Sequence, residues 1–372
     1  MEIEPFALER YFARYEFSAR YLLSSSDCES MSLGELLALT DPEAYQLWLE
    51  MKFGYTESQG HPLLRGSIAE TYSQMAADDI LVLVPEEGIF LLMHALLKPG
   101  DHVVCTFPAY QSLFEVARSI GCQVDTWEPL ETQGWVFDAS QLERRLRSST
   151  KLVVVNFPHN PTGFVPSLAE YERIVEIVRE RGIHLLSDEM YRYLEIEPGS
   201  TLPAGCDLYE KAISLSGLSK SYGLPGLRIG WNATKDTDLL QQTALLKDYT
   251  TICSSAPSEV LALIAVRARQ TILEQQLKRV RANLIHLDGF FARNLDHFVP
   301  NRPLGGSICF PRMPGVPDTD QFCRQLVERT GIMLVPSRMF QYGDQHVRIG
   351  FGRQDLPDVL VRFERYLATE LR

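Results

Sequence analysis

The middle of the chain alternates short apolar runs with longer stretches in which apolar residues recur at helical spacing. The apolar runs predict strands at 80–84, 102–106, 123–127, 151–156, 183–186, 211–215 and 228–231. The periodic stretches predict helices at 86–97, 110–120, 138–146 and 168–181. Strands that alternate with helices are typical of an α/β domain, with a mainly parallel central sheet and helices on both faces.

The pattern changes beyond Pro257. A long helical stretch runs toward Phe298, and after it short predicted strands mix with helices. These strands lie at 307–310, 332–335 and 346–349, and the helices at 320–329 and 355–371. We therefore expect a large domain over residues 46–284 and a smaller α+β domain made of 1–45 and 285–372, with the helical N-terminal segment packed against the latter.

Composition narrows the classes of function. The 372 residues suffice for two domains, and 36 basic against 48 acidic residues give a net charge of −12. Because the chain also has no basic run, it is a poor partner for nucleic acid or for an anionic membrane surface. Its longest apolar stretch, near residues 88–93, falls far short of the roughly 18 residues of a membrane span.

The cysteines and histidines indicate in which cellular compartment the protein lies and whether it has a metal site. The seven cysteines contain no Cys-x-x-Cys pair, and the eight histidines contain no His-Glu-x-x-His motif. The first residues carry neither the basic region nor the apolar core of a secretory signal. We therefore expect a cytoplasmic protein with buried free thiols and without a dedicated metal site.

Polar residues follow the ends of several predicted strands. Asn160 comes after strand 151–156, Asp188 and Tyr191 come after the next strand, and Lys220 lies among small residues in a turn. Each alone has an ordinary explanation, such as a helix cap for Asp188 or a surface position for Lys220. Open α/β sheets, however, bind ligands at the carboxyl ends of their strands, so the set predicts a ligand site there.

Three motifs carry a family resemblance. A Ser-Lys-x-x-Gly-x-x-Gly-x-Arg-x-Gly run begins at Ser219, an Asn-Pro-Thr-Gly turn begins at Asn160, and an Asp-x-x-Tyr pair begins at Asp188. In this order they resemble the fold-type I, pyridoxal-phosphate-dependent aminotransferases of classes I and II, and the resemblance extends from about residue 55 to 348. It implies that fold and pyridoxal 5′-phosphate as the cofactor.

The resemblance implies roles around the cofactor ring. Lys220 would form the Schiff base with the cofactor and act as the general base at the substrate Cα. Asp188 would pair with the pyridine nitrogen, and Tyr191 and Asn160 would hydrogen-bond the phenolic oxygen. Tyr110 would stack on the ring. Lys220, Asp188 and Tyr191 are thus the expected catalytic residues.

The resemblance also implies a site for the cofactor phosphate. Arg228 would bind the phosphate, together with Ser219 and the amides of Glu86 and Glu87 at the start of a helix. The sequence departs from many relatives here, because they carry a small Gly-Ala or Ser-Gly pair at the start of this helix. They also carry a serine where this chain has Gly217. The groups that complete the phosphate site therefore stay open.

Substrate and subunit contacts complete the expected site. Arg348 matches the arginine that grips the substrate α-carboxylate with a planar guanidinium, with Asn160 beside it. Tyr55 resembles a tyrosine that reaches across a homodimer interface to the partner's phosphate. The expected protein is therefore a homodimer with shared active sites that acts on an α-amino acid.

The simplest activity is transamination, but the cofactor residues do not fix the reaction. The alternative is a lyase or cyclase, since residues 15–30 are similar to a branch that includes capreomycidine synthase, which cyclises a hydroxylated arginine. In this stretch Asp27 and Glu29, more than Glu16, are candidates to face a cationic substrate side chain such as a guanidinium.

A cofactor-sensing regulator is a minor alternative. Such regulators carry a DNA-binding domain in front of the aminotransferase-like part. Only about 50 residues precede Tyr55, and the chain is acidic and shows no basic recognition helix. These features argue against the regulator.

Overall fold

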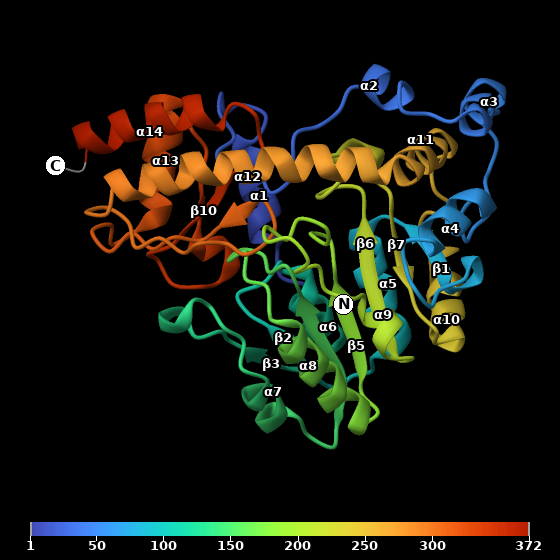
Figure 1. The fold of residues 1–372 in the computed structure, drawn as a ribbon. Coiled ribbons are helices and arrows are strands. Elements are labelled where there is room, and N and C mark those ends of the chain that lie inside the picture. The colour runs from blue at the N-terminus through green and yellow to red at the C-terminus, as the bar shows by residue number, and fades with distance from the viewer. Residues whose placement is uncertain (1, 371–372) are drawn as a thin grey trace.

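The computed structural model describes residues 2–370 and contains a seven-stranded sheet in the order β1-β7-β6-β5-β4-β2-β3 (Figure 1). The strands are β1 (Ile80–Leu83), β2 (His102–Thr106), β3 (Gln123–Trp127), β4 (Thr150–Asn156), β5 (His184–Asp188), β6 (Ala212–Gly217) and β7 (Gly230–Ala233). Strands β6, β5, β4, β2 and β3 pair in parallel, and β7 is antiparallel to both neighbours. Strand β1 therefore runs in the same direction as β6.

Helices cover both faces of this sheet, as the alternation of strands and helices predicts. They are α5 (Pro85–Leu96), α6 (Ser112–Ile120), α7 (Ala139–Arg145), α8 (Leu168–Glu180), α9 (Gly205–Leu208) and α10 (Thr237–Lys247). Side chains of β4 alternate between the two faces. Leu152 and Val154 pack in one core with α5 and α6, whereas Val153 and Val155 pack in another with α7 and α8.

The predicted strands are found with shifted ends, and one shift matters for the site. The run predicted at 228–231 begins as a strand only at Gly230. Arg228 lies before it, with φ of +54° in the left-handed region that residues other than glycine rarely adopt. Its side chain is therefore presented by a turn and not by a strand.

The C-terminal part holds a second, three-stranded antiparallel sheet in the order β8-β10-β9. Its elements are α11 (Ala256–Arg267), α12 (Arg269–Arg293), β8 (Ile308–Cys309), α13 (Thr319–Thr330), β9 (Val335–Pro336), β10 (Val347–Gly350) and α14 (Leu356–Glu370). The long predicted helix is thus two helices that meet at Ala268. Figure 1 shows α12 running across the molecule from α11 toward α14.

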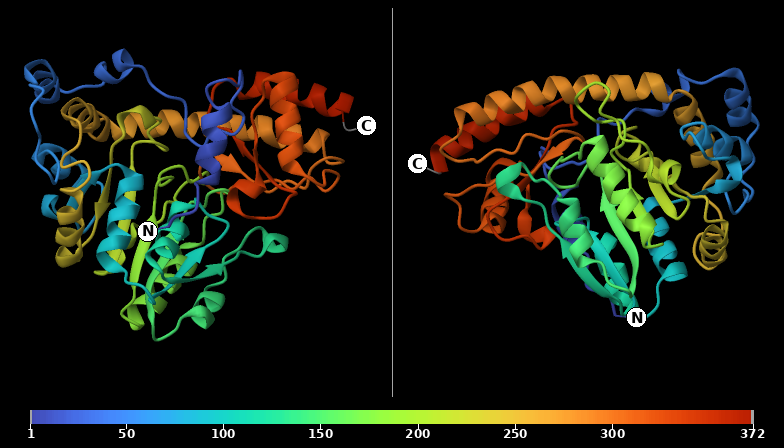
Figure 2. Two further views of the ribbon diagram at one scale, coloured as in Figure 1. Left: turned by 180° about the vertical axis from the view of Figure 1, so that it is seen from behind. Right: turned by 60° about the horizontal axis from the view of Figure 1, so that its bottom comes forward.

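The N-terminal helices lie in two places. Helix α1 (Ala7–Tyr15) lies beside the C-terminal part (Figure 2), and the Tyr11 hydroxyl donates to Leu334 O over 2.9 Å. Helices α2 (Leu33–Leu37) and α3 (Pro42–Glu50) instead pack in one core with α11 and with α4 (Pro62–Ala69). Their packing differs from the expected place of residues 1–45 in the small domain, and the domain boundaries stay a prediction.

No helix within residues 2–370 is long and apolar enough to cross a membrane. All seven cysteines are free, and five of them are buried. Burial raises the pKa of Cys28 to about 12, which keeps that thiol protonated and unreactive.

Candidate active site

The carboxyl ends of the parallel strands form the floor of a cavity of about 620 Å³. Asn156, the last residue of β4, lies opposite Asp188, the last residue of β5, and Asp188 lies opposite Leu215 of β6. Eleven residues singled out from the sequence line this cavity together: Glu16, Asp27, Glu86, Tyr110, Asn160, Asp188, Tyr191, Ser219, Lys220, Arg228 and Arg348. The topology thus brings together side chains from both sheets and from the N-terminal segment.

Lys220 lies in the turn after β6, and its side chain points into the cavity. Its Nζ donates a 2.8 Å hydrogen bond to the Ser26 hydroxyl. Burial lowers the pKa of Lys220 below its ordinary value; the nearby Asp27 opposes this shift and Arg348 adds to it. A lysine with a lowered pKa can lose its proton and act as a nucleophile or base.

Asp188 is buried at the floor of the cavity, where its Oδ1 accepts the Met190 amide over 3.1 Å. Burial raises the pKa of its carboxyl group to about 7, and the neighbouring Glu189 adds to this shift. Within residues 2–370, Asp188 has no ion-pair partner. A protonated ring nitrogen in the cavity would supply the missing positive charge.

Asn156 organises this floor, although sequence reasoning overlooked it. Its side-chain nitrogen donates to Asp188 O over 3.1 Å, and its side-chain oxygen accepts the Asn160 amide over 2.7 Å. One amide therefore fixes two residues of the expected cofactor site. The sequence feature that could have identified Asn156 is its place at the end of an apolar strand, because α/β sheets bind ligands at the carboxyl ends of their strands.

Arg348 reaches the cavity from β10 and is almost completely buried. Its guanidinium donates to Ser24 O over 3.0 Å and to Asn160 Oδ1 over 3.3 Å, and its Nε has no partner within residues 2–370. No carboxylate of these residues pairs with it. A buried guanidinium of this kind is prepared to bind a carboxylate that arrives from outside.

Tyr191 presents a second unpartnered polar group. Its hydroxyl is buried and lacks a hydrogen-bond partner in the part of the chain that the structure describes. Burial raises the pKa of this hydroxyl, so it stays protonated and can donate to an incoming oxygen.

In the region expected to hold the phosphate, the structure explains why residue 217 is a glycine. A Cβ atom at Gly217 would lie 3.1 Å from Pro85 Cγ, and one at Gly230 would lie 2.5 Å from the same atom. Pro85, at the start of α5, therefore occupies the space beside Gly217 that a serine side chain would need. Ser219, Arg228 and the first turn of α5 line the cavity here.

Glu86, in that first turn, is the unusual member of this region. Burial raises the pKa of its carboxyl group to about 7; Glu9 and Asp188 add to the shift, while Ser112 and Arg228 oppose it. A neutral carboxyl group can donate a hydrogen bond to an anion, whereas a charged one would repel it.

Three residues considered in the sequence lie outside the cavity. Glu87 accepts hydrogen bonds from Thr250 and Thr251 and is turned away. Glu29 accepts the Gln354 amide over 2.9 Å. Tyr55 is 89% exposed and does not line this cavity.

Helix α1 contributes acidic residues that the sequence analysis overlooked or ranked low. Glu9 lines the cavity and accepts the Tyr110 hydroxyl over 2.8 Å. Glu16, at the end of α1, also lines it, and burial raises the pKa of its carboxyl group. Asp27 instead pairs with Arg353 over 2.8 Å. The sequence analysis ranked Asp27 and Glu29 above Glu16 as candidates to face a cationic substrate side chain. In the structure, Glu16 is the one of the three that lines the cavity without an ion-pair partner within residues 2–370.

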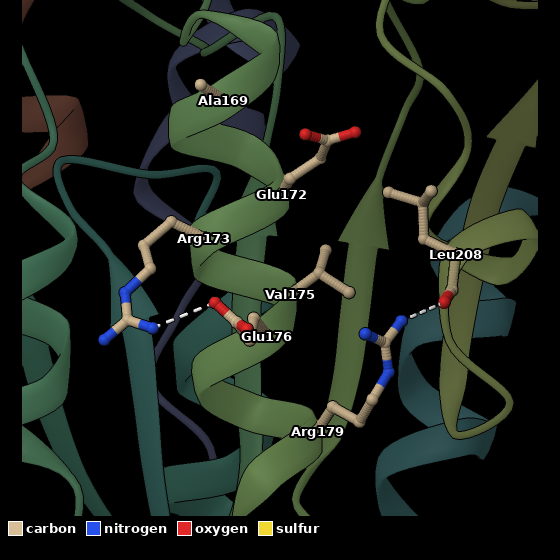
Figure 3. A pocket seen from close by; sticks show the side chains of 7 residues that line it. All are labelled: Ala169, Glu172, Arg173, Val175, Glu176, Arg179 and Leu208. Carbon is tan, nitrogen blue, oxygen red and sulfur yellow. Dashed lines mark hydrogen bonds and ion pairs between the residues drawn. The ribbon is translucent and has the colours of Figure 1, made fainter.

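A second hollow lies on the surface of α8, next to Leu208 (Figure 3). Three of the four charged side chains that line it are already used, since Arg173 pairs with Glu176 over 2.9 Å and Arg179 donates to Leu208 O. Exposed pairs of this kind are typical of a solvated helix face, and they offer no converging polar groups for a ligand.

Comparison with known proteins supplies the family. Residues 38–362 match the family described as aminotransferase class I and II. The chain belongs to this family. Capreomycidine synthase of Streptomyces vinaceus is 31% identical over 375 residues, which cover 100% of this chain and 94% of that protein.

Two solved structures are similar over nearly the full length. A pyridoxal-phosphate-dependent aminotransferase from Streptococcus suis shares 32% identity with a TM-score of 0.92, covering 99% of this chain and 98% of that one. The pyridoxal-phosphate-dependent cyclase OrfR shares 30% identity with a TM-score of 0.88, covering 98% of both chains.

Pyridoxal 5′-phosphate is therefore the cofactor of this protein. The residues that line the cavity also fit this cofactor. Among the residues that the structure describes, Asp188 has no cationic partner and the Tyr191 hydroxyl has no acceptor, and Arg228 and the start of α5 can hold a phosphate. Asp188, Tyr191 and Asn160 would hold the ring, with Tyr110 against it.

Proposed function

We propose that this protein transforms an α-amino acid by transamination, with Lys220 as the covalent attachment point of pyridoxal phosphate. The observation that supports this most is that Lys220 and Arg348 lie in the same cavity. Both line it, and one guanidinium nitrogen of Arg348 has no partner among residues 2–370. An amino acid whose carboxylate binds Arg348 would present its amino group and Cα toward Lys220.

The bound cofactor supplies an electron sink that stabilises negative charge on the substrate Cα. The chain's residues would do the rest. Asp188 keeps the ring nitrogen protonated, and Tyr191 and Asn160 donate to the phenolic oxygen. Lys220, with its lowered pKa, takes the Cα proton on one side of the substrate and returns it to another carbon.

A cyclase or lyase is the second candidate, and full-length similarity favours it. Capreomycidine synthase and the cyclase OrfR match as much of this chain as the aminotransferase structure does.

The charges in the cavity support a substrate with a cationic side chain. Asp188 is assigned to the ring nitrogen, and Asp27 is neutralised by Arg353. Glu9 and Glu16 then stay without a cation within residues 2–370. They are seven residues apart on α1, so both project from one face of this helix into the cavity. A desolvated ammonium or guanidinium would balance them and discriminate strongly against neutral side chains.

A homodimer is part of the proposal. Phe53, Tyr55 and Tyr249 are each about nine-tenths exposed, which is unusual for large side chains. The loops that carry them are close together, since Ser58 Oγ donates to Asp248 over 3.1 Å and Thr56 Oγ1 to Ser254 O over 3.4 Å. A second subunit that covers this patch would receive Tyr55. The free cysteines support a reducing, cytoplasmic setting.

The test begins with the attachment point. Borohydride reduction of the loaded enzyme, followed by peptide mapping, should place the pyridoxyl group on Lys220; a label on another lysine rejects the assignment. A panel of arginine-like, aliphatic, aromatic and acidic amino acids is then assayed for keto acid, for ammonia and for cyclised product. Keto acid formation supports transamination, and a ring product without keto acid supports the cyclase.

Arg348→Lys separates substrate binding from cofactor binding. Lysine keeps the charge but loses the planar guanidinium, so KM should rise and kcat/KM should fall by about 100-fold, while the absorbance of the bound cofactor stays the same. Equal reaction of amino acids and their decarboxylated amines in the unmodified enzyme would contradict a carboxylate site at Arg348.

A further inference from the structure

The segment Ser24–Ser26 passes between the end of β10 and the turn that carries Lys220. The Gly350 amide donates to Leu23 O over 2.8 Å, which ties the segment to β10. A Cβ atom at Gly350 would lie only 1.9 Å from Ser25 O. The backbone of this segment can therefore lie against β10 only because residue 350 is a glycine.

Two side chains of the site, one that binds substrate and one that is catalytic, donate hydrogen bonds to this segment. Ser24 O accepts a hydrogen bond from the Arg348 guanidinium over 3.0 Å. The Ser26 hydroxyl accepts a hydrogen bond from Lys220 Nζ over 2.8 Å. Ser26 is buried, and the Ser307 hydroxyl donates to its carbonyl oxygen over 2.9 Å. The Ser26 side chain is thus held against the Lys220 amine from a fixed backbone.

We propose that Ser26 is a further catalytic residue, whose hydroxyl holds the Lys220 amine in position and stabilises it while it carries the substrate's Cα proton. The proposal rests on the proposed role of Lys220. In this step the Cα–H bond breaks, its electron pair stays with the substrate and cofactor, and the proton forms a new N–H bond on Lys220. Ser26 neither gains nor loses a proton; it accepts a hydrogen bond from the resulting ammonium.

Other charged groups also face the Lys220 amine. Asp27, Glu9 and Asp188 raise its pKa, and Arg348 lowers it; burial is the largest influence and lowers the pKa overall. The ammonium is therefore the costly form, and a hydrogen bond to it is worth more than one between neutral groups. Loss of the Ser26 hydroxyl should lower the pKa of Lys220 further and free the amine to rotate.

The first test uses the apoenzyme, so it does not depend on activity. Trinitrophenylation of Lys220, located by peptide mapping, is followed against pH. The midpoint for Ser26→Ala should lie about one pH unit below that of the unmodified protein. Ser26→Thr, which keeps a hydroxyl, should restore the midpoint. Ser24→Ala removes a buried hydroxyl that has no partner within residues 2–370, and should leave the midpoint unchanged.

The second test uses the loaded enzyme. Exchange of the substrate Cα proton with deuterated water should slow at least tenfold in Ser26→Ala, with KM nearly unchanged and with recovery in Ser26→Thr. Ser26→Cys, which keeps the size of the side chain but accepts hydrogen bonds weakly, should fall between the two and guards against a folding defect in the alanine variant. Equal midpoints and equal exchange rates in all variants overturn the proposal for Ser26. A pyridoxyl label outside Lys220 overturns the proposed function instead.

Discussion

Arg353 and Asp27 form an ion pair at the wall of the cavity, with 2.8 Å between the guanidinium nitrogen and the carboxylate oxygen. The Asp27 side chain is only 14% exposed, so water screens this pair weakly. Glu16 lines the same cavity and has no such partner in the described part of the chain; burial raises the pKa of its carboxyl group, and Asp27 and Glu9 add to that shift. A cation that enters the cavity therefore gains most beside Glu16.

The first prediction follows from this difference. Glu16→Gln should lower kcat/KM for arginine 10- to 100-fold, because hydrogen bonds to charged groups contribute about 1.5–3 kcal/mol. The same change should leave citrulline, which has a similar shape without the charge, nearly unaffected. Glu29→Gln is the matched control, since Glu29 lies outside the cavity. A preference for arginine over citrulline that survives Glu16→Gln would refute this role.

The ligand site at the carboxyl edge of the sheet could be predicted from the sequence, because the motif residues lie where the expected topology places such sites. Asn160 and Lys220 follow parallel strands and Asp188 is the last residue of one, and strands of one direction end at one edge of the sheet. Arg348, from a separate sheet, was singled out because it matches an arginine of the family that the chain resembles, and it lines the same cavity. Hydrophobic periodicity reveals the elements that these residues flank, whereas their expected roles came from that resemblance.

The acidic residues of the N-terminal segment could not be ranked from the sequence as partners for a substrate cation. Whether a carboxylate is free depends on long-range partners, such as Arg353 for Asp27 and the Gln354 amide for Glu29. Glu9 lies in an ordinary amphipathic pattern, so its spacing gives no sign that it reaches the cavity. Such pairings across more than 300 residues have no local signal in the sequence.

The second prediction concerns Asp188 and pH. Its pKa in the folded protein without cofactor is about 7, well above the ordinary value of 3.8. The folded state therefore favours the protonated form, so stability is full below about pH 4 and is lost as pH rises through 7. Asp188→Asn removes this loss, so the apoenzyme variant should become more stable than the unmodified apoenzyme as pH rises from 5 to 8, by up to a few kcal/mol.

Urea unfolding of both apoenzymes at pH 5 and pH 8 measures this effect. Glu195, whose carboxyl pKa is also raised to about 7, is present in both proteins and cancels in the comparison. Glu86 does not cancel fully, because the charge of Asp188 adds to its raised pKa; in Asp188→Asn that addition is lost, which changes stability in the same direction. With cofactor bound, the order should reverse, because Asp188 then has the ring nitrogen as a partner. A stability difference that does not change with pH would show that Asp188 is charged in the apoenzyme.

The third prediction tests why Gly217 replaces the serine of many relatives. A Cβ atom there would lie 3.0 Å from Gly230 Cα and 3.1 Å from Pro85 Cγ, which is closer than side chains normally pack. Gly217→Ser should therefore weaken cofactor binding and destabilise the protein by about 1–3 kcal/mol, as overpacking does. Replacing Pro85 by alanine in the same protein should recover part of the loss. Tighter cofactor binding in Gly217→Ser alone would contradict this account.

The last prediction asks in which subunit Tyr55 acts. Tyr55 is 89% exposed and lies outside the cavity of its own subunit, whereas Lys220 lines that cavity. If Tyr55 serves the partner's phosphate, Tyr55→Phe and Lys220→Ala should each impair the homodimer. A hybrid of the two, however, should regain one complete site: the Lys220 of one subunit is served by the unchanged Tyr55 of the other.

Co-expression with two affinity tags isolates the hybrid, and its activity is compared with both parent homodimers. About half of the unmodified activity per dimer is expected, since one of the two sites is complete. The matched control combines Asp188→Asn with Lys220→Ala. Both of these residues line the cavity of their own subunit, so no hybrid of this pair contains a complete site and its activity should stay low. Recovery in the Tyr55 hybrid alone, with an impaired Tyr55→Phe homodimer, places Tyr55 in the partner's site. No recovery in either hybrid means that Tyr55 acts within its own subunit, and a fully active Tyr55→Phe homodimer means that Tyr55 has no role in the site.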